Sequence, residues 1–91
     1  MQLTYIQDPG HGWIGCPTDL ALQLHIVDRI SPYSYIDGDT FWLEEDCDAG
    51  ILIDALRAAN LHFEIIERYV DHTHIRDLPR VNNPNWRSPT W

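Results

Sequence analysis

The chain contains no lysine, and all six of its basic residues are arginine. Without lysine there is no P-loop lysine to hold nucleotide phosphates and no amine for Schiff-base chemistry, which excludes both enzyme classes. Cysteine is also scarce, because Cys16 and Cys47 are the only two and lack a CxxC spacing. They can form neither a disulfide framework nor a zinc knuckle, so buried free thiols are the simplest interpretation.

Long apolar runs are missing as well. No window reaches the roughly eighteen consecutive apolar residues of a membrane span. The first residues also lack the basic region and apolar stretch of a signal peptide. We therefore expect a soluble protein that is not exported. Its 91 residues, 44% of them hydrophobic, fit one domain with a modest core.

Positive charge is in short supply, since 6 basic residues face 14 acidic ones for a net charge of −8. This excess disfavours nucleic acid and anionic membranes as direct partners, and it permits a basic protein partner or mimicry of DNA. Residues 76–91 nevertheless carry three arginines against Asp77, a net charge of +2, which leaves −10 on residues 1–75. We expect one folded domain over 1–75 and a basic tail over 76–91 that is attracted to the body.

Segments rich in β-branched and aromatic residues predict strands. These segments are residues 3–7, 13–16, 33–36, 40–43 and 62–70, and the last one can extend toward His74. Asp8-Pro9-Gly10 predicts a tight turn after the first strand, and Asp37-Gly38-Asp39 predicts a hairpin connection.

Helical spacing of apolar residues predicts one main helix over about 48–59, with Asp46 or Asp48 as its cap. Pro17-Thr18-Asp19 can start a short helix over about 18–24. The fold class is therefore α+β, with a small antiparallel or mixed sheet of about four to five strands.

The tail should be irregular, because Pro79, Pro84 and Pro89 oppose regular structure. Trp86 and Trp91 can anchor it by burying large apolar areas. We expect the tail to pack on its own body or on a neighbouring subunit, and a homo-oligomer is the expected assembly.

Residues 10–15 match the GxGxxG pattern of dinucleotide-binding folds. The residues after Gly12 are poor helix starters and no long βαβ crossover follows, so we reject that fold. The two glycines instead predict a turn that exposes backbone N–H groups and presents His11 beside Trp13. Such a turn can bind an anion or a planar ring. The alternative is an ordinary hairpin loop with a solvated His11 and a core Trp13.

We predict a ligand-binding site that combines this turn with hairpin aromatics able to stack on a base and with tail arginines able to neutralise phosphate. Its predicted residues are Asp8, Gly10, His11, Gly12, Trp13, Tyr33, Tyr35, Trp42, Arg76 and Arg80, with Arg87 as a further candidate arginine. We assign no catalytic residue, metal ligand or cofactor, and we expect binding rather than catalysis.

The remaining polar clusters favour simpler interpretations. Residues 44–48 lack the ligand spacing of an EF-hand loop and indicate helix capping and solvated charge. Acidic neighbours should keep Cys47 a neutral thiol. His72 and His74 could supply half of a metal site, completed by His11 or another histidine.

Three motifs follow in order along the chain: Asp8–Trp13, Ile30-Ser31 with Tyr33-Ser34-Tyr35, and Leu43–Ala49. With them the chain resembles, over about residues 5–60, a family of small, largely uncharacterised proteins encoded by phages and prophages. The resemblance carries over no catalytic residue. It implies residence in the cytoplasm of the bacterial host and a role against host immunity.

These observations support three hypotheses. The first is a phage accessory protein that counters host defence by binding and sequestering a small nucleotide-like immune signal. The second is an acidic inhibitor that binds a host defence protein, with DNA mimicry as one mode. The third is a metal-dependent hydrolase that uses His11, His72 or His74.

Overall fold

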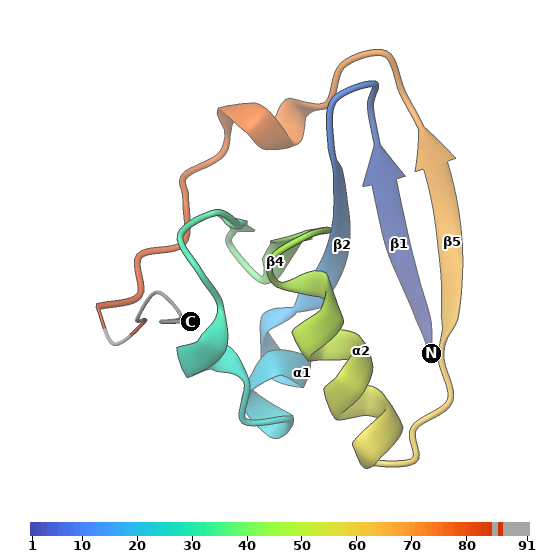
Figure 1. The fold of residues 1–91 in the computed structure, drawn as a ribbon, viewed down its shortest axis with the longest axis vertical. Helices are drawn as coiled ribbons and strands as arrows, with labels where there is room; N and C mark the ends of the chain where they lie inside the picture. The colour runs from blue at the N-terminus through green and yellow to red at the C-terminus, as the bar shows by residue number, and fades with distance from the viewer. Residues whose placement is uncertain (85, 87–91) are drawn as a thin grey trace.

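The computed structural model describes residues 1–84 and 86 of the chain (Figure 1). Its elements are β1 (Gln2–Gln7), β2 (Gly12–Pro17), α1 (Thr18–Gln23), the 3-10 helix η1 (Val27–Arg29), β3 (Tyr35–Asp37), β4 (Thr40–Glu44), α2 (Ala49–Ala58), β5 (Glu64–Tyr69) and the 3-10 helix η2 (His74–Asp77). The predicted α+β class, the main helix and the short helix are confirmed. The two 3-10 helices were not expected from the sequence.

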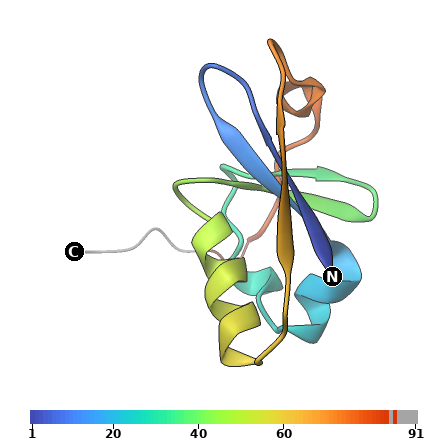
Figure 2. The same cartoon turned by 90° about the vertical axis from the view of Figure 1, so that its right-hand side faces the viewer.

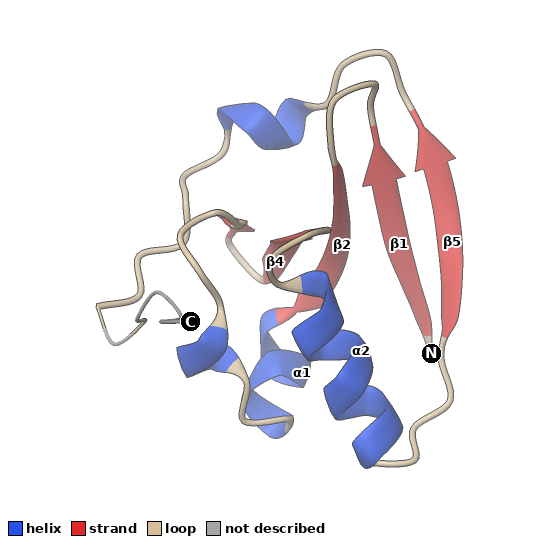
Figure 3. Cartoon of the chain, viewed as in Figure 1, coloured by secondary structure: helices blue, strands red, loops and turns tan. Residues whose placement is uncertain are grey.

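The five strands form one mixed sheet in the order β3-β4-β2-β1-β5 (Figure 3). The β1–β2, β2–β4 and β3–β4 pairs are antiparallel, whereas β5 runs parallel to β1 after the chain has returned through α2. The sheet twists strongly, so that β3 and β4 cross the direction of β5 when the β5 edge faces the viewer (Figure 2). β5 ends at Tyr69 and does not continue to His74.

One face of the sheet carries the hydrophobic core. In the β2–β4 pair, Ile14 lies opposite Leu43 and Cys16 lies opposite Phe41, and all four side chains are buried. The two helices cover this face with apolar residues, of which Leu52 and Leu56 of α2 are fully buried, and Leu20 and Ala21 of α1 also join the cluster. The alternation of strand side chains thus sends every second residue toward the helices.

The opposite face of the sheet carries aromatic and acidic side chains. Here Trp13 lies opposite Glu44, Gly15 lies opposite Trp42, and Tyr35 pairs with Trp42 from the other side. A Cβ atom at Gly15 would lie only 2.8 Å from Cζ3 of Trp42, so the glycine allows the indole to cross the β2 backbone. In the described part of the chain, Arg76 of η2 lies over Trp13 on this face, and residues 79–81 reach it from the side of β3.

Helix α2 begins without the side-chain cap predicted at Asp46 or Asp48. Asp48 is the N-cap residue, but its carboxylate makes no capping hydrogen bond and instead accepts from serine residues of a neighbouring loop. The helix ends where Asn60 takes a left-handed φ of 57°, and Leu61 N donates to Leu56 O at 3.0 Å. No helix in the described part of the chain has the length and apolar composition that a membrane span requires.

The described part of the tail packs on the body of its own chain. Ile36 N donates to Pro79 O and Val81 N donates to Ser34 O, both at 2.9 Å, so residues 79–81 lie beside β3. Asn83 Nδ2 then donates to the carbonyl oxygens of Val27, Asp28 and Ile30. The predicted anchor Trp86 contacts Tyr33, whereas Trp91 and Arg87 lie outside the described residues.

Candidate functional site

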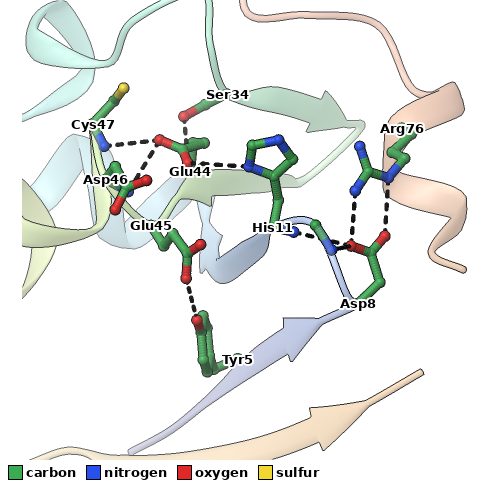
Figure 4. A network of polar contacts seen from close by, with 10 residues as sticks. Tyr5, Asp8, His11, Ser34, Glu44, Glu45, Asp46, Cys47 and Arg76 are labelled. Carbon is green, nitrogen blue, oxygen red and sulfur yellow. Dashed lines mark hydrogen bonds and ion pairs between the residues drawn. The ribbon is translucent and has the colours of Figure 1, made fainter. Parts of the chain in front are cut away.

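Asp8 organises the turn between β1 and β2. Its Oδ1 accepts the backbone N–H groups of Gly10 and His11 at 3.0 Å each. Arg76 binds the same carboxylate with two hydrogen bonds, from Nε to Oδ2 at 2.9 Å and from Nη2 to Oδ1 at 2.7 Å (Figure 4). The hydrogen bonds from Arg76, with those from the turn, hold the pKa of Asp8 well below its ordinary value. The first turn of the sheet is thereby fixed to η2.

This geometry corrects the predicted use of the glycines. The N–H groups of Gly10 and His11 are occupied by Asp8 and are not presented to an anion. Gly38 is the only described glycine with a positive φ, so Gly10 and Gly12 do not serve as left-handed hinges. They allow close approach instead, since a Cβ at Gly10 would lie 2.8 Å from Nη2 of Arg76 and one at Gly12 would lie 2.3 Å from Oη of Tyr5. Donors for an anionic ligand must therefore come from side chains.

Two arginines lie over aromatic rings on the second face of the sheet. Cζ of Arg76 is 5.3 Å from the ring centroid of Trp13, and Cζ of Arg80 is 5.1 Å from that of Tyr35, both within the range of cation–π contacts. The Trp13 and Tyr35 rings meet edge to face with centroids 6.3 Å apart. Arg80 is oriented further by a hydrogen bond to Pro32 O at 3.2 Å. Rings and guanidinium groups form one continuous wall.

Glu44 forms the centre of a facing, acidic wall. It is only 9% exposed, and its Oε2 accepts the N–H groups of Asp46 at 3.0 Å and Cys47 at 2.9 Å. Its Oε1 lies 3.9 Å from Nδ1 of His11. Figure 4 shows this carboxylate between the loop that follows β4 and the imidazole of the β1–β2 turn. The side chain therefore both shapes the loop and faces the solvent-accessible site.

The loop that carries the tyrosines is held by a buried hydrogen-bond network. Oδ2 of Asp48 accepts from Ser31 N at 3.0 Å, from Ser31 Oγ at 2.7 Å and from the hydroxyl of Ser34. Ser31 Oγ in turn accepts the N–H of Tyr33 at 3.1 Å. Asp48, Ser31 and Ser34 are all almost completely buried. This network fixes the backbone on both sides of Tyr33. Ser34, its last member in the loop, directly precedes Tyr35, the first residue of β3.

An open pocket of about 330 Å³ lies between the arginine–aromatic wall and the acidic wall around Glu44. This volume is within the range of small-molecule sites. Its lining residues are His11, Trp13, Tyr33, Tyr35, Glu44, Asp46, Cys47, Arg76 and Arg80. Among these side chains Tyr33 and His11 are well exposed, whereas Trp13 is buried. The pocket is thus cationic and aromatic on one side and acidic on the other.

Six of the predicted site residues meet in this pocket although they come from three distant parts of the chain. They are His11, Trp13, Tyr33, Tyr35, Arg76 and Arg80. Asp8 supports the pocket through Arg76, Gly10 belongs to the turn between β1 and β2, and Gly12 is the first residue of β2. Trp42 lies beside the pocket, packed over Gly15, and does not line it.

The acidic wall was missed at the level of sequence, because residues 44–48 were interpreted as helix capping and solvated charge. One indication was available for Glu44. Strand alternation from Phe41 and Leu43 toward the core places Trp42 and Glu44 together on the other face. The antiparallel pairing of β4 with β2 then brings Glu44 opposite Trp13, and that pairing could not be read from one strand alone.

Within the described residues, one group of side chains could hold a metal ion. The ligand atoms of His11, Glu44 and Glu45 lie within 4.8 Å of one another. His72 and His74, which the hydrolase hypothesis also named, do not belong to this group. The Glu45 carboxylate already accepts the hydroxyl of Tyr5 at 2.5 Å, a contact that raises the pKa of Tyr5 to about 12.

Cys47 is placed poorly for nucleophilic chemistry. Desolvation and the adjacent Glu44 carboxylate raise the pKa of its thiol to about 12, so it is protonated at neutral pH. Burial likewise raises the pKa of Cys16 to about 11. Both thiols are free, and their raised pKa values favour the neutral form over the nucleophilic thiolate.

No protein-family model, curated protein or solved structure matches the chain. The functional argument therefore depends on the residues of the pocket and on their chemistry.

Proposed function

We propose that this protein binds a small nucleotide-like molecule in the pocket and retains it unchanged, and that it thereby sequesters an immune signal in the cytoplasm of a bacterial host. The observation that carries the proposal is the convergence of Arg76 and Arg80 with the rings of Tyr33 and Tyr35 around one pocket of about 330 Å³. Guanidinium groups and aromatic rings are the side chains that bind phosphates and stack on bases.

The charge distribution favours a ligand with two chemically different ends. The hydrogen bond described for the Arg80 guanidinium is the one to Pro32 O. Its other N–H groups can therefore donate to phosphate oxygens. Arg76 already forms an ion pair with Asp8, so it contributes to phosphate binding mainly through the electrostatic attraction of its positive charge. On the other side the Glu44 and Asp46 carboxylates can accept from base amino groups or ribose hydroxyls. Inorganic phosphate alone would satisfy only the first side.

Nucleophilic catalysis by the cysteine that lines the pocket is disfavoured by its raised pKa. Cys47 lines the pocket, but its raised pKa keeps the sulfur protonated. A nucleophilic enzyme would require the opposite shift.

The group formed by His11, Glu44 and Glu45 supports a second candidate, a metal-dependent hydrolase. It predicts that purified protein retains a divalent transition metal and loses activity in chelator. Elemental analysis of protein purified without chelator separates the two candidates, because simple sequestration requires no metal.

The direct test incubates the protein with a panel of linear and cyclic nucleotides, removes free ligand, denatures the protein by heat and identifies released molecules by mass spectrometry. We expect at least one nucleotide to be released intact. R80Q should retain it about tenfold less or worse, whereas R57Q, which changes an exposed arginine in the last turn of α2, should retain it normally. Release of no nucleotide from the whole panel contradicts the proposal and leaves the acidic inhibitor as the better hypothesis.

A further inference from the structure

Strand β5 is an edge strand whose side chains are exposed on both faces. All six of its residues are exposed, and they include three large hydrophobic side chains: Ile65 at 37%, Ile66 at 39% and Tyr69 at 64%. Natural edge strands are usually protected by charged side chains, above all lysine, by proline, by a bulge or by a covering segment, and the charged residues of β5 are Glu64, Glu67 and Arg68. β5 has no lysine or proline, pairs in continuous register with β1, and has no described segment outside it (Figure 2).

The backbone of β5 offers a defined set of hydrogen-bonding groups. Glu64 N donates to Met1 O and Val70 N donates to Gln7 O, both at 2.9 Å. In a strand, alternate residues direct both N–H and C=O to the same side. The even-numbered residues therefore bind β1, and the odd-numbered residues Ile65, Glu67 and Tyr69 direct their N–H and C=O groups away from the sheet.

A second copy of the chain fits this edge when two β5 strands pair about a two-fold axis. Such a pair must be antiparallel, and hydrogen bonding requires odd residues to lie opposite odd residues. One register places Ile65 opposite Glu67 of the second copy. Ile66 then meets Ile66 of the second copy at the axis, and Glu64 meets Arg68 of the second copy twice, once on each side.

The neighbouring registers lack the two pairs of opposite charge, and the step that places Ile65 opposite Ile65 of the second copy leaves Glu64 opposite Ile66. A step in the opposite direction places Glu67 opposite Glu67 of the second copy. A further step places Arg68 opposite Arg68. Like charges directly opposite each other destabilise a strand pair, whereas opposite charges stabilise it. Charge complementarity therefore selects the register centred on Ile66.

We propose that the protein forms a homodimer through antiparallel β5–β5 pairing, which joins the two sheets into one continuous ten-stranded sheet. The pairing brings Ile66 of the two copies together and satisfies the outward backbone groups of Ile65 and Glu67. The pocket lies near β2, β3 and β4, on the far side of β1 from this edge. Each dimer consequently carries two pockets, and dimerisation does not depend on a ligand.

The test is sedimentation equilibrium of the full chain and its charge variants, at about 0.15 M salt so that the repulsion between two acidic copies is screened. The wild type should form dimers. E64R places arginine opposite Arg68, and R68E places glutamate opposite Glu64, so each variant alone should dimerise about tenfold more weakly or worse. D54R and R57E, charge reversals on exposed residues of α2, should dimerise like the wild type.

An equimolar mixture of E64R and R68E gives a result that misfolding cannot imitate. In the mixed dimer both cross-strand pairs are again of opposite charge, so heterodimers should form even though each variant alone is monomeric. The double variant E64R/R68E should also recover homodimers. A monomeric wild type at all concentrations, or single variants that dimerise as well as the wild type, would overturn the proposal.

Discussion

The two edges of the sheet differ in how they are covered: the β3 edge is paired with the tail, whereas the β5 edge is open among the described residues. At the β3 edge, residues 79–81 of the tail add hydrogen bonds to Ile36 and Ser34 and bring Arg80 over Tyr35. At the β5 edge, no described residue occupies the outward backbone groups, and every side chain of the strand is exposed.

At β3, the segment that protects the edge of the sheet is also the segment that completes the pocket. The tail that closes the edge also supplies the cationic wall of the pocket, through Arg76 on Trp13 and Arg80 on Tyr35. The open β5 edge contributes nothing to the pocket and is free for a second copy. Substitutions at the closed edge should therefore change stability and ligand binding, and substitutions at the open edge should change association alone.

The largest effect is expected at the network behind the closed edge. D48A removes the acceptor of three hydrogen bonds from Ser31 and Ser34 in a fully buried position. Because the donors would be left buried without a partner, we expect a loss of about 3 kcal/mol in the free energy of unfolding, measured in urea. D54A, on the exposed side of α2, is the matched control and should change stability by less than about 0.5 kcal/mol.

The next effect concerns the attachment of the tail. R76Q removes both hydrogen bonds to Asp8 and the contact with Trp13, so the described tail should detach more often from the body. Trypsin should then cleave after Arg80 several-fold faster than in the wild type, and nucleotide retention should fall. Cleavage at an unchanged rate would show that the ion pair does not hold the tail, and R57Q provides the comparison for a lost arginine elsewhere.

Acid should loosen the same attachment in a defined pH window. The pKa of Asp8 is depressed in the folded state, so its contribution is fully present above the unfolded value of about 3.9 and is lost as the pH falls through the lower folded value. The stability difference between wild type and D8N should be constant from neutral pH to about pH 5 and should shrink below about pH 4. A difference that already disappears near pH 6 would contradict the assignment.

The smallest effect on the single chain is expected at the open edge. R68Q changes an exposed side chain without a described partner within the monomer, so the free energy of unfolding at dilute, monomeric concentration should change by less than about 0.5 kcal/mol. The same variant should weaken dimers. A large loss of monomer stability would mean that Arg68 has a role within the chain and that the two edges differ less than proposed.

Much of the fold could be predicted because its local patterns agree with one another. The apolar spacing of Ile51, Leu52, Ala55 and Leu56 defined α2, and the turn residues after β1 and β3 defined both hairpin connections. The parallel placement of β5 next to β1 could not be predicted, because it depends on contacts between residues about sixty positions apart.

The site could be predicted in part for the same reason. Residue chemistry alone brought forward His11, Trp13, Tyr33, Tyr35, Arg76 and Arg80, which line the pocket together. It also named Trp42, which does not line the pocket because strand register packs its indole over Gly15. It also misjudged the N–H groups of the β1–β2 turn, because their acceptor, Asp8, is a side chain of the turn itself.

The most direct test of the central claim is mass spectrometry of molecules released by heat from protein purified out of bacteria with active nucleotide-based immune signalling. The account predicts that an intact nucleotide is released from the wild type, in an amount approaching one per chain, and that R80Q releases far less. Wild-type protein that releases no nucleotide, or R80Q that releases as much as the wild type, would contradict the assignment of the pocket.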